Sequence, residues 1–91
     1  MTAPLFPLGR VVATPGALNL LSETGTNPAE LLVRHQGGDW GEVPPEDAAE
    51  NELSVREGFR IISSYPVGSS RVWVISEADR SATTILLPEE Y

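Results

Sequence analysis

The residue types that acid–base chemistry uses gather in one stretch, HQGGDWGEVPPED at residues 35–47. His35 is the single histidine in the sequence, so any imidazole chemistry must use it. Asp39 follows four residues later, and Asp47 and Asn51 fall on one side of a helix expected after the two prolines. A histidine near carboxylate and amide oxygens is typical of a general acid–base or a divalent-cation site. This stretch is the first candidate for chemistry.

A second group of reactive side chains lies in SEADRSATT at residues 76–84. Here Glu77 and Arg80 stand beside serine and threonine hydroxyls, a combination that phosphoryl and acyl chemistry uses. Joined to the first stretch, this group gives an enzyme hypothesis. In a small hydrolase or nuclease-like protein, His35 would act as general acid–base, and Asp39, Glu77 or Arg80 would orient the substrate or stabilise charge.

Both groups also have a structural interpretation, which the local pattern favours. Gly37 and Gly38 break the helix between His35 and Asp39, so the helical spacing that would align the two side chains is lost. A histidine in a last helical turn commonly interacts with the free carbonyls there. The sequence contains neither a nucleophile elbow nor a phosphate-binding glycine loop. We therefore expect no catalytic residue, metal or cofactor, and keep the enzyme as the alternative.

Composition and charge favour binding to a protein. The chain has 91 residues, is 41% hydrophobic and carries a formal net charge of −7, with arginine as its only basic residue type besides the histidine. This size predicts a single domain over residues 1–91. An acidic surface repels nucleic-acid phosphates and suits a basic protein partner. The start lacks the pattern of a signal peptide, and no apolar run approaches ~18 residues, so we expect a cytoplasmic protein without membrane contact.

The first half of the chain predicts a short strand followed by two or three helices. LGRVVAT at 8–14 is typical of a strand. Each predicted helix has proline at or before its start and glycine after its end. The third has only a thin apolar stripe, so we expect it at the surface. The predicted helices span 15–24, 28–36 and 46–57.

The last third predicts an antiparallel three-stranded β-meander, with strands at 59–67, 71–78 and 82–88. A two-residue loop at 68–69 would place Arg60 opposite Glu77 and keep each face of the sheet consistent. The predicted fold class is therefore α+β, with the helices between the N-terminal strand and the meander.

Both faces of this meander are apolar, which is unusual for a sheet with one side in water. Phe59, Ile61 and Tyr65 begin one face, whereas the other carries Ile62, Trp73, Ile75 and Leu86. The second face must be covered by the N-terminal segment and the third helix, or by another chain, because an open patch around a tryptophan is rare in monomers. The candidate binding residues are Trp73, Ile62 and Leu86, together with Trp40 and Asp47.

The segments VVATPGAL, RHQGGDWGE, RIISSY and VWVISEADRSATTILLPEEY resemble a family of small proteins encoded on bacterial plasmids and integrated mobile elements. The resemblance covers nearly the whole chain and is most specific in the last twenty residues. It implies a bacterial mobile-element setting and brings no activity or catalytic residue.

Together, these observations predict a non-enzymatic interaction protein that acts through an acidic surface and an aromatic contact area. Its partner would be a host or element-encoded protein, such as a nucleic-acid-handling or defence enzyme whose basic groove it blocks. The other alternative is a homodimer that seals the second sheet face by self-association.

Overall fold

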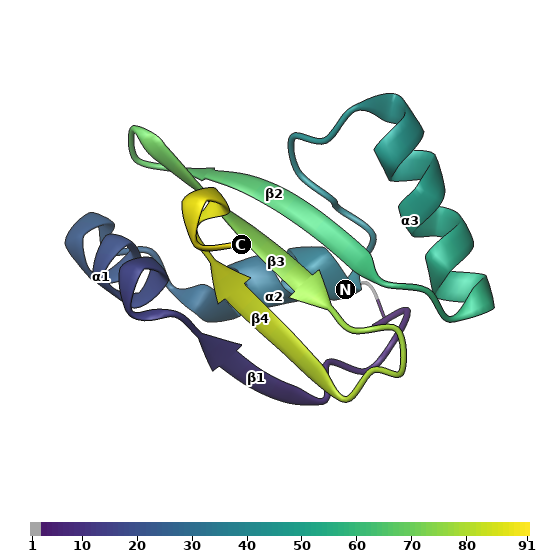
Figure 1. The fold of residues 1–91 in the computed structure, drawn as a ribbon. Coiled ribbons are helices and arrows are strands. Elements are labelled where there is room, and N and C mark those ends of the chain that lie inside the picture. The colour runs from purple at the N-terminus through teal and green to yellow at the C-terminus, as the bar shows by residue number, and fades with distance from the viewer. Residues whose placement is uncertain (1–2) are drawn as a thin grey trace.

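The structure is a computed structural model that describes residues 3–91 (Figure 1). It is an α+β fold in which a four-stranded sheet carries three helices. In chain order the elements are β1 (Arg10–Ala13), α1 (Pro15–Thr24), α2 (Pro28–Gln36), α3 (Pro45–Glu57), β2 (Ile61–Val67), β3 (Ser70–Ser76), β4 (Ala82–Leu86) and the 3₁₀ helix η1 (Pro88–Glu90).

The helices begin and end where the capping residues of the sequence place them. The side chains of Thr14 and Asn27 accept hydrogen bonds from the first turns of α1 and α2, at 3.2 and 3.0 Å. Gly25 and Gly58 end α1 and α3 in the left-handed conformation. All three predicted helices are present, and α3 starts at Pro45, one residue before the predicted start.

The predicted antiparallel strands β2, β3 and β4 are present, but the sheet is mixed, because β1 joins them as a fourth strand. Its strand order is β1-β4-β3-β2; β2, β3 and β4 pair antiparallel, and β1 pairs parallel to β4. Three helices and two strands separate β1 from β4, and such a long connection allows parallel pairing. Local strand signals carry no information on that distant neighbour, so the sequence pattern missed it.

The register of the β2–β3 hairpin agrees with the prediction. Val67 lies opposite Ser70 across a two-residue loop, and Ile62 lies opposite Ile75. Beyond the strand ends, Arg60 and Glu77 form the expected ion pair at 3.5 Å. Phe59, however, lies outside β2 and is 52% exposed, so its predicted place on the first face was wrong.

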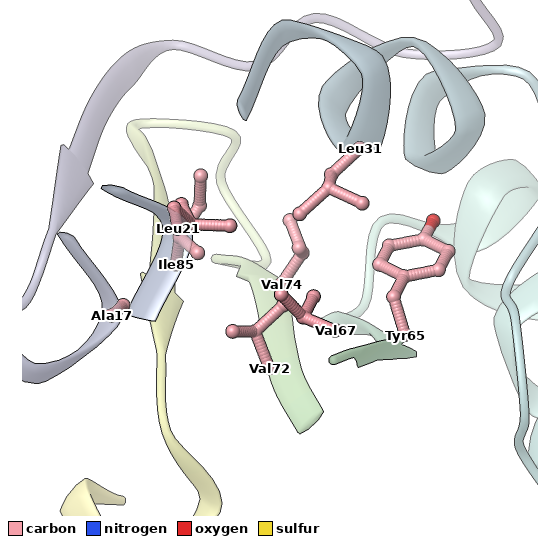
Figure 2. Close-up of a cluster of buried hydrophobic side chains, with 8 residues drawn as sticks. All are labelled: Ala17, Leu21, Leu31, Tyr65, Val67, Val72, Val74 and Ile85. Atoms are coloured by element: carbon pink, nitrogen blue, oxygen red, sulfur yellow. The ribbon is translucent and has the colours of Figure 1, made fainter. Parts of the chain in front are cut away.

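The main core lies between the first face of the sheet and the helices α1 and α2 (Figure 2). A second cluster of Phe6, Trp40 and Ile61 lies on the same face. The N-terminal segment therefore packs on the first face of the sheet through Phe6, and not on the second as expected. The second face is left to α3 and to the C-terminal residues. The residues of the main cluster are Ala17, Leu21, Leu31, Tyr65, Val67, Val72, Val74 and Ile85.

Candidate functional site

A cavity of about 580 Å³ opens between α3 and the second face of the sheet. We call it the α3 groove. Ile62, Ser64 and Trp73 line it from the sheet, and Asn51 faces it from α3. The other residues that line it are Glu42, Val43, Pro44, Asp47, Glu50, Ser54, Phe59, Arg60 and Tyr91.

One wall of the groove exists because a buried amide fixes α3 to the edge of β2. Asn51 is 5% exposed, and its side chain donates to the carbonyl of Ile62 at 2.8 Å and accepts from the Ile62 N–H at 3.1 Å. The amide thus satisfies both backbone groups that an edge strand presents at this residue. The face of α3 that meets the sheet buries Asn51 and Ser54 and no large apolar side chain, which leaves room for the groove.

The segment between α2 and α3 forms the second wall. Ser64 donates its N–H to the carbonyl of Trp40 at 3.0 Å, and its carbonyl accepts from the N–H of Glu42 at 2.7 Å, so this segment pairs with the outer edge of β2. Asp39 holds the turn before it, because its carboxylate accepts from Arg34 Nε at 2.7 Å and from the Gly41 N–H at 3.1 Å. The Arg34 guanidinium lowers the pKa of Asp39. Residues 37–44 are therefore a structured joint.

The aromatic side chains of the groove come from three parts of the chain. Trp73 on β3 meets the ring of Tyr91 edge to face, with centroids 5.6 Å apart. Arg60 donates to the Tyr91 hydroxyl at 2.8 Å and pairs with Glu77, so its charge is already engaged. Phe59 exposes half of its ring beside them. An apolar group that enters the groove thus meets aromatic carbon.

The rim of the groove is acidic. Glu42, Asp47 and Glu50 line it and are exposed, and of these Glu42 pairs with Arg71 at 3.0 Å. Within residues 3–91, Asp47 and Glu50 have no ion-pair partner. Aromatic walls below unpaired carboxylates suit a ligand that combines an apolar part with a positive charge.

His35 lies in a different part of the molecule, on the first face of the sheet. Its ring is 0% exposed. Nδ1 lies 2.6 Å from the hydroxyl of Ser63, and Nε2 lies 3.0 Å from the hydroxyl of Ser76. Phe6 and Trp40 pack against the ring edge to face. This environment is typical of a structural histidine whose two nitrogens are both satisfied.

The hydrogen bonds around His35 fix its tautomer. The hydroxyl of Thr83 donates to the carbonyl of Leu8 at 2.8 Å, so its oxygen accepts from Ser76, 2.6 Å away. Ser76 has then used its only hydrogen and must accept from His35 Nε2–H. Nδ1 is left as the acceptor of the Ser63 hydroxyl. The neutral imidazole therefore completes a chain from β2 through β3 and β4 to the N-terminal segment.

This burial makes stability depend on pH. Desolvation, assisted by the charge of Arg80, lowers the pKa of His35 to about 4, against roughly 6.5 in an unfolded chain. Between these values the unfolded state binds a proton that the folded state does not, so stability falls as the pH falls. We expect the free energy of unfolding to be about 2 kcal/mol smaller at pH 5 than at pH 7.

Urea unfolding at the two pH values measures that loss, and NMR titration of the single imidazole assigns it. Carboxylates with a lowered pKa, such as Asp39, lose their contribution only below about pH 4 and do not interfere. A ring that titrates near its ordinary pKa in the folded protein would contradict the buried, neutral histidine.

No protein-family model, curated protein or solved structure matches this chain. None of the helices within residues 3–91 has the length and apolar character needed to cross a bilayer. The same residues contain no group of three or more histidine, aspartate or glutamate side chains placed to hold a metal ion. The site must therefore be judged on its own geometry.

The residues of the enzyme hypothesis have separate side-chain partners. His35 bonds Ser63 and Ser76, Asp39 bonds Arg34, and Glu77 bonds Arg60. The guanidinium of Arg80 donates to backbone carbonyls, including that of Ser54 at 2.8 Å, and lies over the ring of Phe6. Phe6 in turn packs on His35, which has no exposed surface. Arg80 thus ties α3 to the turn after β3.

The predicted binding residues divide into two sets. Ile62, Trp73 and Asp47 line the α3 groove, as accessible side chains. Leu86 lies opposite Trp73 across the β3–β4 pair but is only 6% exposed, and Trp40 is 5% exposed. Trp40 therefore acts as a core anchor of the joint, with its indole N–H 3.3 Å from Glu52.

Most of the other lining residues were not predicted as binding residues, among them Glu50, Phe59 and Tyr91. Glu50 had a usable signal, because it follows Asp47 by three residues and so shares its side of a helix. The other two depend on how the chain turns outside the strands. Tyr91 reaches Trp73 only because η1 bends the chain after β4.

Proposed function

We propose that this chain is a non-enzymatic interaction protein of bacterial mobile-element origin, and that it binds a basic segment of a protein partner in the α3 groove. The observation that carries the proposal is the groove itself, which combines aromatic walls with unpaired carboxylates at the rim. Its volume of about 580 Å³ lies within the range of specific ligand sites. A lysine or arginine side chain satisfies both parts, since its stem packs on aromatic carbon and its charge reaches the rim.

The backbone groups along the outer edge of β2 are already hydrogen-bonded, which indicates how the partner would be recognised. Asn51, Trp40 and Glu42 already occupy the outward backbone groups of Ile62 and Ser64. A bound segment therefore cannot add as a strand beside these residues and must be recognised through its side chains. This favours one or two anchoring side chains over an extended β-pairing.

The net charge of −7 supports a partner with a basic surface. Complementary charge accelerates encounter and excludes acidic proteins. Nucleic-acid-handling and defence enzymes have such surfaces, and an acidic protein that docks there competes with phosphates. The family resemblance supplies the mobile-element setting in which such a block would act.

The test uses a short synthetic peptide of alternating lysine and leucine, followed by NMR of the indole N–H groups. The chain has two tryptophans, so the buried Trp40 serves as an internal reference for the accessible Trp73. We expect the Trp73 signal, assigned with a Trp73→Phe variant, to shift on titration while the Trp40 signal stays. The double variant Asp47→Lys/Glu50→Lys should weaken binding about tenfold or more.

The matched control is Glu23→Lys/Glu30→Lys, which changes net charge equally at exposed positions outside the groove. Equal losses in the two double variants would show a non-specific charge effect and overturn the proposed site. A peptide in which glutamate replaces lysine should not bind. If neither indole responds to the basic peptide, the groove is not a binding site for such segments.

A further inference from the structure

The two edges of the sheet are protected very differently. At β2, side-chain and loop groups fill the outward backbone positions, and Pro66 has no N–H to offer. At β1, the N–H groups of Arg10 and Thr14 point inward and bond Ser81 and Ile85, both at 3.0 Å. The alternation of a strand then turns the N–H and C=O of Val11 and Ala13 outward. Figure 1 shows β1 as the outermost strand, with no described segment beyond it.

The side chains of β1 are also unprotected. Val11 is 43% exposed and Val12 is 38% exposed, on opposite faces of the strand. Proteins usually guard such an edge with a very short strand, charged side chains, proline or a bulge, because free backbone groups beside apolar side chains recruit another strand. β1 has four residues and one charged side chain, Arg10, but neither proline nor a bulge, which leaves Val11 and Val12 exposed at the edge.

We propose that β1 is a self-association edge, at which the β1 strands of two copies pair antiparallel about a twofold axis through Val12. The backbone groups select this register. Pairing Val11 with Ala13 of the second copy, and the reverse, uses every outward group of both strands. A register that pairs Val11 with Val11 of the second copy, or Ala13 with Ala13, uses only half of the outward backbone groups of β1. The selected register places Val12 against Val12 and joins the two sheets into one.

Charge complementarity argues for a second copy over a foreign strand. In this register Arg10 faces Thr14 of the other copy, on the same side of the sheet as Val12. The Thr14 hydroxyl donates to the carboxylate of Glu90 at 2.5 Å, which holds that charge beside the end of β1. Arg10 forms no ion pair within residues 3–91. Each copy therefore presents an arginine where the other presents a glutamate, twice per dimer.

The interface is small, because β1 spans only Arg10–Ala13. We therefore expect a weak dimer that dissociates on dilution, at the lower end of the size range of specific interfaces. Sedimentation velocity over a concentration series at low salt measures it. The wild-type chain should move from monomer to dimer as concentration rises, without forming larger species, since each copy has one such edge.

Two sets of variants test the register. Val12→Lys sets two like charges face to face at the axis and should raise the dimer dissociation constant about 100-fold or more. Val33→Lys, at a valine on α2 that is 66% exposed, is the matched control and should leave it unchanged. Arg10→Glu and Glu90→Arg should each weaken the dimer roughly tenfold, and the double variant should recover it.

A wild-type chain that stays monomeric up to millimolar concentration overturns the proposal, and so does an equal loss in Val33→Lys. Failure of the charge-swapped double variant to recover the dimer rules out the stated register. Circular dichroism of each variant separates loss of pairing from loss of fold. The Val12→Lys variant should still bind the lysine–leucine peptide, because the α3 groove lies at the opposite edge of the sheet. The dimer and the groove can thus fail independently.

Discussion

Replacing His35 with leucine will lower the free energy of unfolding by about 4 kcal/mol, although the two side chains are similar in size and leucine is the more apolar. The loss arises from the groups that remain. Ser63 loses the acceptor of its hydroxyl hydrogen, and Ser76 loses the donor to its oxygen, and both serines are fully shielded from bulk solvent. A buried polar group left without a partner costs about 1–3 kcal/mol. The loss of edge-to-face contacts with Phe6 and Trp40 adds to this.

Urea unfolding followed by circular dichroism measures the change, with Ser63→Ala/Ser76→Ala added to His35→Leu as the informative control. Once both serines are removed as well, nothing polar around the new leucine lacks a partner except the accepting side of Thr83. The triple variant should therefore regain about half of the loss. If the single variant does not fold at all, the triple variant still reports on the network. A single variant within about 1 kcal/mol of the wild type would contradict the role given to the histidine.

The same residue shows where prediction from sequence stops. The pattern around His35 correctly located it in the last turn of a helix, where free carbonyls were the expected partners. Its actual partners, Ser63 and Ser76, lie on two strands far along the chain. They share the first face of the sheet with Ile61 and Val74, because alternate residues of a strand face the same way. The strand pattern identifies Ser63 and Ser76 only as polar positions. It cannot predict that both hydroxyls contact a histidine.

Features set by neighbouring residues were predicted well. Thr14, Asn27 and Gly58 fixed helix ends through contacts within a turn of the chain. The β2–β3 register followed from a two-residue loop and from the Arg60–Glu77 pair. The parallel pairing of β1 with β4 joins residues about seventy positions apart and was missed. Long-range pairing depends on the whole topology, which local periodicity does not encode.

The α3 groove combines both cases. Apolar alternation on a second sheet face predicted that Ile62 and Trp73 need a cover, and both line the groove. The third helix was one of the covers expected for this face, but the apolar stripe could not show how it attaches, because the buried residues of α3 are Asn51 and Ser54. A polar residue that bonds an edge strand looks, in sequence, like any solvated position on a helix. The groove is the space left beside a helix that an amide fixes to the edge strand, while its apolar residues Ala48 and Val55 pack against the Phe6–Trp40–Ile61 cluster.

Residues 37–44, the joint that forms the second wall of the groove, contain one glycine, Gly41, at which no side chain can be accommodated. Gly41 has a φ of 74°, and a Cβ atom there would lie 2.1 Å from the carbonyl oxygen of Ser64 and 2.6 Å from the ring of Tyr65. Both obstacles belong to the central part of β2 and cannot move without breaking the core. We therefore expect Gly41→Ala to lower the free energy of unfolding by about 4 kcal/mol, from backbone strain and from separation of the joint from the strand.

Gly58→Ala is the matched control for this substitution. Gly58 has a φ of 80° but no atom within 4 Å of the added Cβ, so only the strain of the left-handed conformation is introduced, at a cost of about 1 kcal/mol. The difference between the two variants in urea unfolding isolates the steric contact with Ser64. Equal losses would mean that the joint is free to move away from β2. Because Glu42 and Val43 follow Gly41 directly into the groove, any folded Gly41→Ala protein should also bind the lysine–leucine peptide more weakly, whereas Gly58→Ala should bind it normally.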